Sequence, residues 1–392
     1  MAVSYADRQA LAVLAPTVTR ELQISDVGYG WLLSAFSLAY LVAAPFAGRA
    51  IDHFGARRGL VAAVLAWSAV AGMHALLPGP TYGFVALLAL RVALGVAEAP
   101  SFPGATQTVH RTLLPVDRPR GFGVLYVGSS LGAMVVPPLC GWMQGEFGFR
   151  IAFLGVAAVG LLWVPIWMAV TSPAAARAVL DRPTADGLGV TPPWAQLLRD
   201  PVVLRGIAAT AAVAPLMSFT LNWSAKYLVA AFALPQRAIG HYLWLPPLLF
   251  DVGSVAFGVW AATVMRARNQ PAPRLPMALA AGLGAVLVAI PLANGPWLAV
   301  LLCGVAMAGG GGMFALFTAD TLGRVPASAV AATAGCLASA QSIAYIAASP
   351  LIGKGVMQLG YAWVLAALVL WLLPGLLFWA SFRRAAGPAV VA

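Results

Sequence analysis

Long apolar segments separated by short polar connections recur along almost the whole chain. A helix needs about 20 predominantly apolar residues to cross the hydrocarbon core of a bilayer. Twelve segments approach or exceed this length, covering approximately residues 2–19, 27–50, 59–78, 82–110, 120–144, 149–171, 203–232, 238–265, 275–293, 296–319, 327–353 and 360–382. The pattern predicts an all-α membrane protein with twelve transmembrane helices.

The connection between the sixth and seventh segments is longer and more polar than the others, and it is rich in proline and charged residues. We therefore predict two six-helix halves, residues 1–171 and 203–392, joined by a cytoplasmic linker at 172–202. Transporters built from two such halves bind their substrate near the bilayer midplane and work by rocking one half against the other.

Composition supports the membrane prediction. Hydrophobic residues make up 61% of the chain and charged residues 9%, against about 45–50% and about 25% in a soluble domain. The net charge of +11 comes mostly from arginines in alternate connections, whereas the opposite connections carry only Arg20, Arg150, Arg237 and Lys354. By the positive-inside rule, both termini are predicted to be cytoplasmic. The charge therefore indicates topology, and we expect a lipid bilayer as partner and no nucleic acid.

The residues that usually carry enzyme chemistry are scattered. Cys140, Cys303 and Cys336 lie inside apolar segments without metal-ligand spacing, and we interpret them as small packing residues. The chain has no Walker-type phosphate loop and no nucleophile–base arrangement above chance. We therefore predict that the protein is not an enzyme and that it has no metal site and no resident cofactor.

Two segments carry charges where charges are expensive. Arg91 and Glu98 lie seven residues apart in the fourth segment, about 10 Å apart on nearly the same helix face. Ionisable residues inside a membrane usually face the bundle interior or a watery cavity, so this face is predicted to point inward. The alternative is a structural role, in which Arg91 and Glu98 neutralise each other or a neighbouring helix and merely hold the bundle together. Their spacing exceeds the three or four residues of the usual pair within one helix. We favour Arg91 as a source of positive potential for an anion and Glu98 as a proton carrier. Asp7 and Arg8 form a second such pair in the first segment.

Residues 48–59, GRAIDHFGARRG, resemble the loop between helices 2 and 3 of the major facilitator superfamily. The residues that match its pattern are Gly48, Asp52, Gly55, Arg57 and Arg58. The resemblance implies that this loop acts as a conformational latch. Gly48 would let helices approach, and Gly55 would turn the chain.

A narrower resemblance, to the anion:cation symporters of that superfamily, covers nearly the whole chain. It rests on YADR (5–8), SLAYL (37–41), RVALGVAEAPSFPG (91–104) and NWSAKYL (222–228), and WLPPLLFDVGS (244–254) is most similar to the hexuronate branch. It implies a monomeric transporter of a bacterial-type inner membrane that imports a sugar acid or another carboxylate by proton symport.

The resemblance also implies roles for particular side chains. Glu98 and Asp7 would carry protons, and Arg91 and Arg8 would bind the substrate carboxylate. Further substrate contacts are predicted for Tyr40, Trp223, Lys226 and Gln341, although Tyr40 could equally pack at an interface. Lys226 could equally snorkel to the membrane surface, and polar residues near Gln341 could mediate ordinary helix packing.

Two other functions stay open. A proton-coupled efflux antiporter for amphipathic cations would need more acids than bases in its cavity, and Arg8 and Arg91 at least balance Asp7 and Glu98. A transport-inactive sensor would be expected to lose these pairs.

Two local features of the predicted helices are unusual. The first segment is near the lower length limit for a span, so either its start lies upstream or its cytoplasmic end is shortened. The glycines at 309–312 are expected to weaken and bend their helix.

Overall fold

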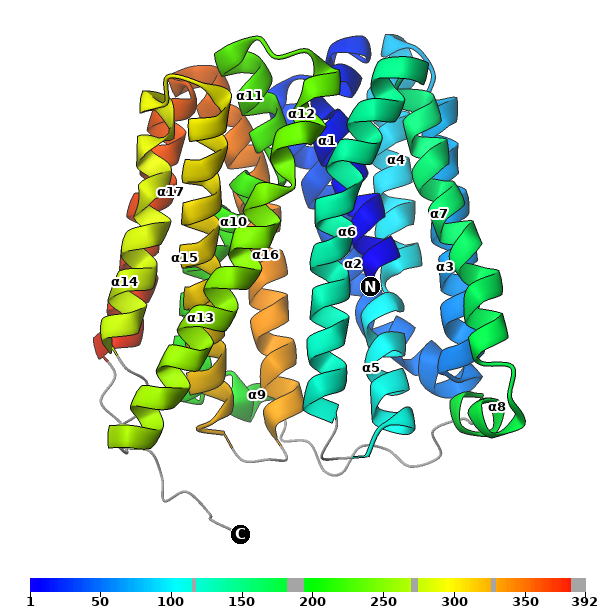
Figure 1. The fold of residues 1–392 in the computed structure, drawn as a ribbon, viewed down its shortest axis with the longest axis vertical. Coiled ribbons are helices and arrows are strands. Elements are labelled where there is room, and N and C mark those ends of the chain that lie inside the picture. The colour runs from blue at the N-terminus through cyan, green and yellow to red at the C-terminus, as the bar shows by residue number, and fades with distance from the viewer. Residues whose placement is uncertain (115–117, 182–193, 269–273, 326–328, 382–392) are drawn as a thin grey trace. The chain divides into compact units, whose positions relative to one another are not determined.

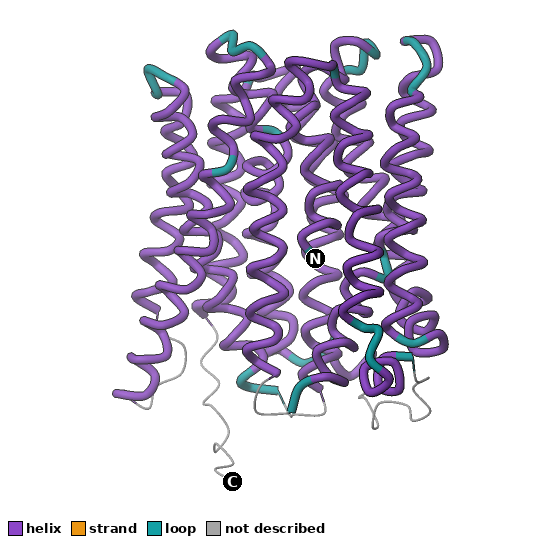
Figure 2. Tube along the Cα trace, turned by 45° about the vertical axis from the view of Figure 1, so that its right-hand side comes forward, coloured by secondary structure: helices purple, strands orange, loops and turns teal. Residues whose placement is uncertain are grey.

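The computed structural model describes residues 1–114, 118–181, 194–268, 274–325 and 329–381. Within these ranges the regular elements are helices, as the trace in Figure 2 shows. Ten helical segments in the described chain are long and apolar enough to cross a membrane. Each of the twelve predicted segments overlaps one observed helix or two consecutive helices. The predicted all-α membrane fold is confirmed.

The chain divides into two compact units, which we describe separately. Unit 1 contains Met1–Gly187, Asn222–Trp244 and Ser349–Gly353, and unit 2 contains Leu188–Leu221, Leu245–Ala348 and Lys354–Ala392. Two segments that follow the predicted linker in the chain, 222–244 and 349–353, thus pack with the residues that precede it.

Unit 1 is built around the amino-terminal helices (Figure 1). Its helices are α1 (Ala2–Glu21), α2 (Asp26–Phe54), α3 (Ala56–Met73), η1 (His74–Leu76), α4 (Pro80–Glu98), α5 (Ser101–Thr112), α6 (Arg118–Phe147), α7 (Phe149–Val170), α8 (Ala174–Leu180), α11 (Ser224–Phe232) and α12 (Gln236–Leu243). In unit 2 lie α9 (Trp194–Leu197), α10 (Pro201–Asn222), α13 (Leu245–Arg268), α14 (Arg274–Ala285), η2 (Val286–Leu292), α15 (Pro296–Leu322), most of α16 (Val330–Leu359) and α17 (Tyr361–Ser381).

The central helix of unit 1 is α1, which has 20 residues. It packs against α6, α7, α11 and α12, and in Figure 1 it lies behind α6. Leu14, Ala15 and Val18 are fully buried. Because α1 is covered by other helices of the unit, Asp7 and its neighbours lie among protein side chains.

Three predicted segments are interrupted in the structure. The fourth divides into α4 and α5 at Ala99–Pro100, because proline has no backbone N–H to continue the helical hydrogen bonding. The seventh divides at Trp223, and the eighth divides at Trp244, just before Pro246 and Pro247 at the start of α13. The first interruption matters most, because it makes Glu98 the last residue of α4.

Helix α15 continues without interruption through the glycines at 309–312, and the expected bend there stays a prediction. A Cβ atom at Gly309 would lie within 2.3 Å of the Gly284 nitrogen on α14, and one at Gly311 within 2.3 Å of the Phe250 carbonyl oxygen on α13. The glycines therefore allow α15 to pack closely against two neighbours in unit 2.

Candidate substrate and proton site

The centre of the site is an ion pair between α1 and the end of α4. Arg8 Nε donates to Glu98 Oε2 at 2.8 Å, and the Ser4 hydroxyl donates to the same oxygen at 2.8 Å. The Glu98 side chain is 0% exposed, whereas that of Arg8 is 25% exposed. Arg8 is therefore the member of the pair that solvent reaches.

Arg91 and Glu98 both face the interior of unit 1, as their spacing predicted, with exposed fractions of 3% and 0%. Glu98 pairs with Arg8, 90 residues away in the chain, rather than with Arg91. Gly95 lies between the two charges on α4, and a Cβ there would come within 2.5 Å of the Phe36 carbonyl oxygen. The absence of a side chain at Gly95 lets α2 approach the charged face of α4.

Aromatic rings hold both guanidinium groups. The Arg8 Cζ lies 4.7 Å from the centre of the Tyr40 ring, 5.1 Å from that of Phe36 and 5.2 Å from that of Tyr5. The Arg91 Cζ lies 4.6 Å from the centre of the Phe36 ring. Each contact is within the range of cation–π attraction. The Phe36 ring thus contacts the guanidinium groups of both arginines, and the Tyr40 ring stacks on it with a centroid distance of 6.2 Å.

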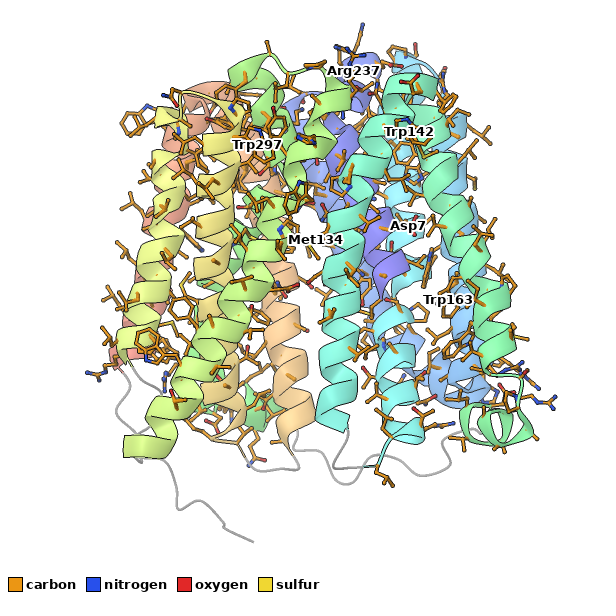
Figure 3. The ribbon with its side chains drawn as sticks, viewed as in Figure 1. Asp7, Met134, Trp142, Trp163, Arg237 and Trp297 are labelled. Carbon is orange, nitrogen blue, oxygen red and sulfur yellow. The ribbon has the colours of Figure 1, made fainter. Side chains whose placement is uncertain are left out.

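Asp7 is the second buried acid of the site and lies on α1 (Figure 3). It is 4% exposed, and neither of its carboxylate oxygens has a hydrogen-bond partner in the described part of the chain. Its electrostatic neighbours are Glu98, Arg91 and Arg8. Two acids and two arginines, from helices α1 and α4, therefore form one interacting group.

Lys226 lies in a different cluster of unit 1. Its Nζ is 2.5 Å from Asp26 Oδ1 at the start of α2, and it donates to the Thr19 hydroxyl at 3.2 Å. The same nitrogen lies 5.2 Å from the centre of the Tyr29 ring. Lys226 thus joins α11 to the adjacent ends of α1 and α2.

Trp223 packs beside this cluster and is fully buried. Its ring meets that of Tyr29 edge to face, with centroids 5.1 Å apart, and the Tyr29 hydroxyl donates to the Asn222 carbonyl oxygen at 2.7 Å. Tyr29 also interacts electrostatically with Arg91. The side chains of Tyr29, Phe36 and Tyr40 therefore connect the lysine cluster to the arginines along one face of α2.

Gln341 belongs to unit 2. Its Nε2 donates to the Tyr345 hydroxyl, one turn further along α16, at 3.3 Å. Both side chains are partly exposed. The predicted contact of Gln341 with substrate stays a prediction.

The loop at 48–59 has some of the features that its resemblance implied. Gly55 has a φ angle of +80°, so it turns the chain as expected. A Cβ at Gly48 would meet nothing within 4 Å among the described residues, which do not show the expected helix approach there. The side chain of Asp52 lies outside the described residues.

The two arginines of this loop bind the beginning of the linker. Arg57 NH1 lies 3.3 Å and Arg58 Nε 3.7 Å from Asp181 Oδ2, just after α8. Arg57 Nε also donates to the Thr171 hydroxyl at 3.0 Å. A Cβ at Gly55 would come within 2.5 Å of the Leu180 carbonyl oxygen, so α8 packs directly on the turn.

Several site residues were not identified from the sequence. Ser4 lies four residues before Arg8 and Phe36 four residues before Tyr40, so helical spacing could have placed each beside its neighbour. Asp26 and Asp181 carry no local signal, because their partners are distant in the chain. Within the described ranges, no group of three or more His, Cys, Asp or Glu residues could hold a metal ion.

A family model described as Major Facilitator Superfamily matches residues 1–339. The hexuronate transporter of Bacillus subtilis is 28% identical over 261 residues, which cover 65% of this chain but only 60% of that protein. The hexuronate transporter of Escherichia coli is 27% identical over 409 residues, covering 97% of this chain and 91% of that protein. The galacturonate transporter of Dickeya chrysanthemi is 27% identical over 270 residues, covering 65% and 76%.

Solved structures show the same architecture. A bacterial homolog of the human lysosomal transporter Spinster superposes with a TM-score of 0.77 at 17% identity, over 96% of this chain and 93% of that chain. The nucleoside transporter NupG superposes with a TM-score of 0.72 at 14% identity, over 97% and 98%. Likeness at these identities concerns the fold alone.

Proposed function

Because the chain belongs to the Major Facilitator Superfamily, and is thus a multi-pass membrane transporter rather than an enzyme, we propose that it imports an organic anion by proton symport with alternating access. The anion is a sugar acid, such as a hexuronate or an aldonate. Relatives named as hexuronate and galacturonate transporters support this substrate class. The observation that carries the proposal is the buried Arg8–Glu98 pair.

Arg8 is the group that first meets the anion. Its Nε donates to Glu98, which is the hydrogen bond of this side chain in the described residues, and the side chain is 25% exposed. A guanidinium group presents a planar fork of donors that matches a carboxylate. Tyr40, whose ring faces Arg8, carries a hydroxyl that can bond a sugar hydroxyl or carboxylate oxygen.

Proton uptake follows from competition for Arg8. A substrate carboxylate that draws Arg8 away leaves the charge of Glu98 buried with one hydrogen bond, from Ser4. Breaking a buried ion pair in this way costs about 3–5 kcal/mol, and binding a proton to Glu98 removes the uncompensated charge. Anion and proton therefore stabilise each other's binding, which is the requirement for symport.

Asp7 and Arg91 complete the site. Asp7 is buried without a hydrogen-bond partner in the described chain, and an unpaired carboxyl is less costly there with a proton than without one. Asp7 is therefore the second proton carrier. Arg91, held on the Phe36 ring, supplies a positive potential that favours an anion.

The transporter works in a bacterial-type inner membrane with both termini in the cytoplasm, as a monomer and without a resident cofactor; the proton is the coupling ion. Efflux of amphipathic cations is the less favoured function, because the exposed member of the charged group is an arginine. The positive charge of Arg8 would repel a cation at the point of entry.

Uptake into proteoliposomes tests the proposal. Purified protein is given labelled hexuronates, aldonates, lactate, tartrate and aromatic acids, with and without an imposed inward proton gradient. Accumulation of a sugar acid that depends on the gradient is expected, together with loss of binding in Arg91→Ala and Arg8→Ala. If every anion fails and lipophilic cations are exported instead, the proposal is refuted.

A further inference from the structure

Ser4 is, besides Arg8, the hydrogen-bond donor to Glu98 in the described chain. Its side chain is 0% exposed, and its hydroxyl donates to Glu98 Oε2 at 2.8 Å. Arg8 donates to the same oxygen, and the other carboxylate oxygen, Oε1, is buried without a partner. Both donors therefore converge on one oxygen and leave the other free to take a proton.

The two donors differ in what they can do when the charge of Glu98 changes. Arginine stays protonated and can only donate, whereas a serine hydroxyl both donates and accepts. When Arg8 binds a substrate carboxylate, Ser4 stays in contact with Glu98. Its hydroxyl can donate to Oε2 whether Glu98 is a carboxylate or carries a proton on Oε1.

We propose that Ser4 is a positioning residue that holds Glu98 in place through the proton cycle and sets the pH at which Glu98 binds its proton. The inference rests on the proposed proton symport and deepens it. No covalent bond changes; one proton binds to Oε1 from the aqueous phase and leaves again, and Ser4 keeps its own proton.

Other titratable groups near Glu98 are retained in the Ser4 variants. They are the side chains of Tyr5, Asp7 and Arg8 from α1 and Arg91 from α4; Tyr40 of α2 interacts electrostatically with Arg8, and His74 of η1 with Arg91. Because these groups are the same in the wild type and in each Ser4 variant, a comparison of the proteins measures the loss of the one hydrogen bond.

The expected shift in the titration midpoint of Glu98 follows from the strength of the lost hydrogen bond. A bond to an ionised carboxylate is stronger than one to its neutral form, so its loss favours the protonated state. The difference in free energy between a hydrogen bond to a charged group and one to a neutral group corresponds to an upward shift of about one pH unit in the titration midpoint of Glu98 when Ser4 is replaced. The sign is fixed because Ser4 stabilises the carboxylate that it now donates to.

Infrared difference spectroscopy during a pH titration measures this midpoint without any substrate. The full-length protein is reconstituted in liposomes, and the carboxyl band of Glu98 is identified by its loss in Glu98→Gln. In Ser4→Ala the midpoint is expected about one pH unit higher than in the wild type. Ser4→Thr keeps the hydroxyl and is expected to titrate like the wild type.

Two further variants separate the hydrogen bond from packing. Ser4→Cys keeps the volume but has a much weaker donor, and it serves if Ser4→Ala fails to fold; it is expected to shift upward as well. Ser68→Ala removes a similarly buried hydroxyl of unit 1 that has no hydrogen-bond partner among the described residues, and it is expected to leave the midpoint unchanged.

The inference is overturned if the midpoint of Ser4→Ala equals that of the wild type, or if the Glu98 band does not titrate. It is also overturned if Ser4→Thr or Ser68→Ala shifts as far as Ser4→Ala, because packing would then be the cause. Failure of the proposed function has a different signature, since the wild type would then take up no sugar acid in proteoliposomes.

Discussion

The strongest prediction concerns Glu98→Gln, which removes the charge but keeps an oxygen that can accept from Arg8. In the wild type, substrate must displace an ionised Glu98 from Arg8. Breaking a buried ion pair costs about 3–5 kcal/mol, whereas a hydrogen bond from the charged arginine to a neutral amide is worth about 1.5–3 kcal/mol, so roughly 2 kcal/mol less has to be overcome. Glu98→Gln is therefore expected to bind substrate more tightly than the wild type at alkaline pH.

The sign and slope follow from linkage. Substrate favours the protonated form of Glu98, so wild-type affinity is high at acidic pH and falls as the pH rises through the midpoint of the free site. One coupled proton gives a fall of about tenfold for each pH unit. In Glu98→Gln the affinity is expected to stay high, because the tenfold fall that Glu98 causes is lost and only the pH dependence due to Asp7 remains.

Equilibrium binding of a labelled sugar acid at several pH values measures this slope, and counterflow and gradient-driven uptake in proteoliposomes complete the test. Glu98→Gln is expected to exchange substrate across the membrane but not to accumulate it. If the variant concentrates substrate against its gradient, or if its affinity falls with pH as in the wild type, Glu98 is not the proton carrier and the coupling argument is wrong.

Three further variants probe the supports of the site. Phe36→Leu removes the ring that two guanidinium groups share, and we expect substrate affinity about tenfold weaker in equilibrium binding, whereas Phe36→Tyr should bind like the wild type. Lys226→Asp is expected to lower the apparent melting temperature by breaking its pair with Asp26; adding Asp26→Lys should recover most of the loss, and no recovery would disprove the pairing. Asp181→Asn removes both loop contacts and is expected to speed hydrogen exchange in α8 about fivefold, for a pair worth about 1 kcal/mol; Arg58→Gln, at a side chain 74% exposed, should change it little.

Much of the fold was accessible from the chain alone, because hydrophobic length and helical periodicity are local. The predicted segments overlap the observed helices, and the seven-residue spacing of Arg91 and Glu98 placed both on the buried face of α4. The turn at Gly55 was predictable for the same reason, since it depends on the φ angle of one residue.

The contacts that give the site its chemistry were decided by packing between distant segments. Nothing in the order of residues says that Glu98 pairs with Arg8 and Ser4, that Phe36 lies beneath two arginines, or that Asp181 binds the loop at Arg57. Gly309 and Gly311 likewise allow close packing, because backbone atoms of neighbouring helices occupy the space of their missing side chains. A charged side chain selects its partner by distance in the folded protein, and those distances exist only once the helices have packed.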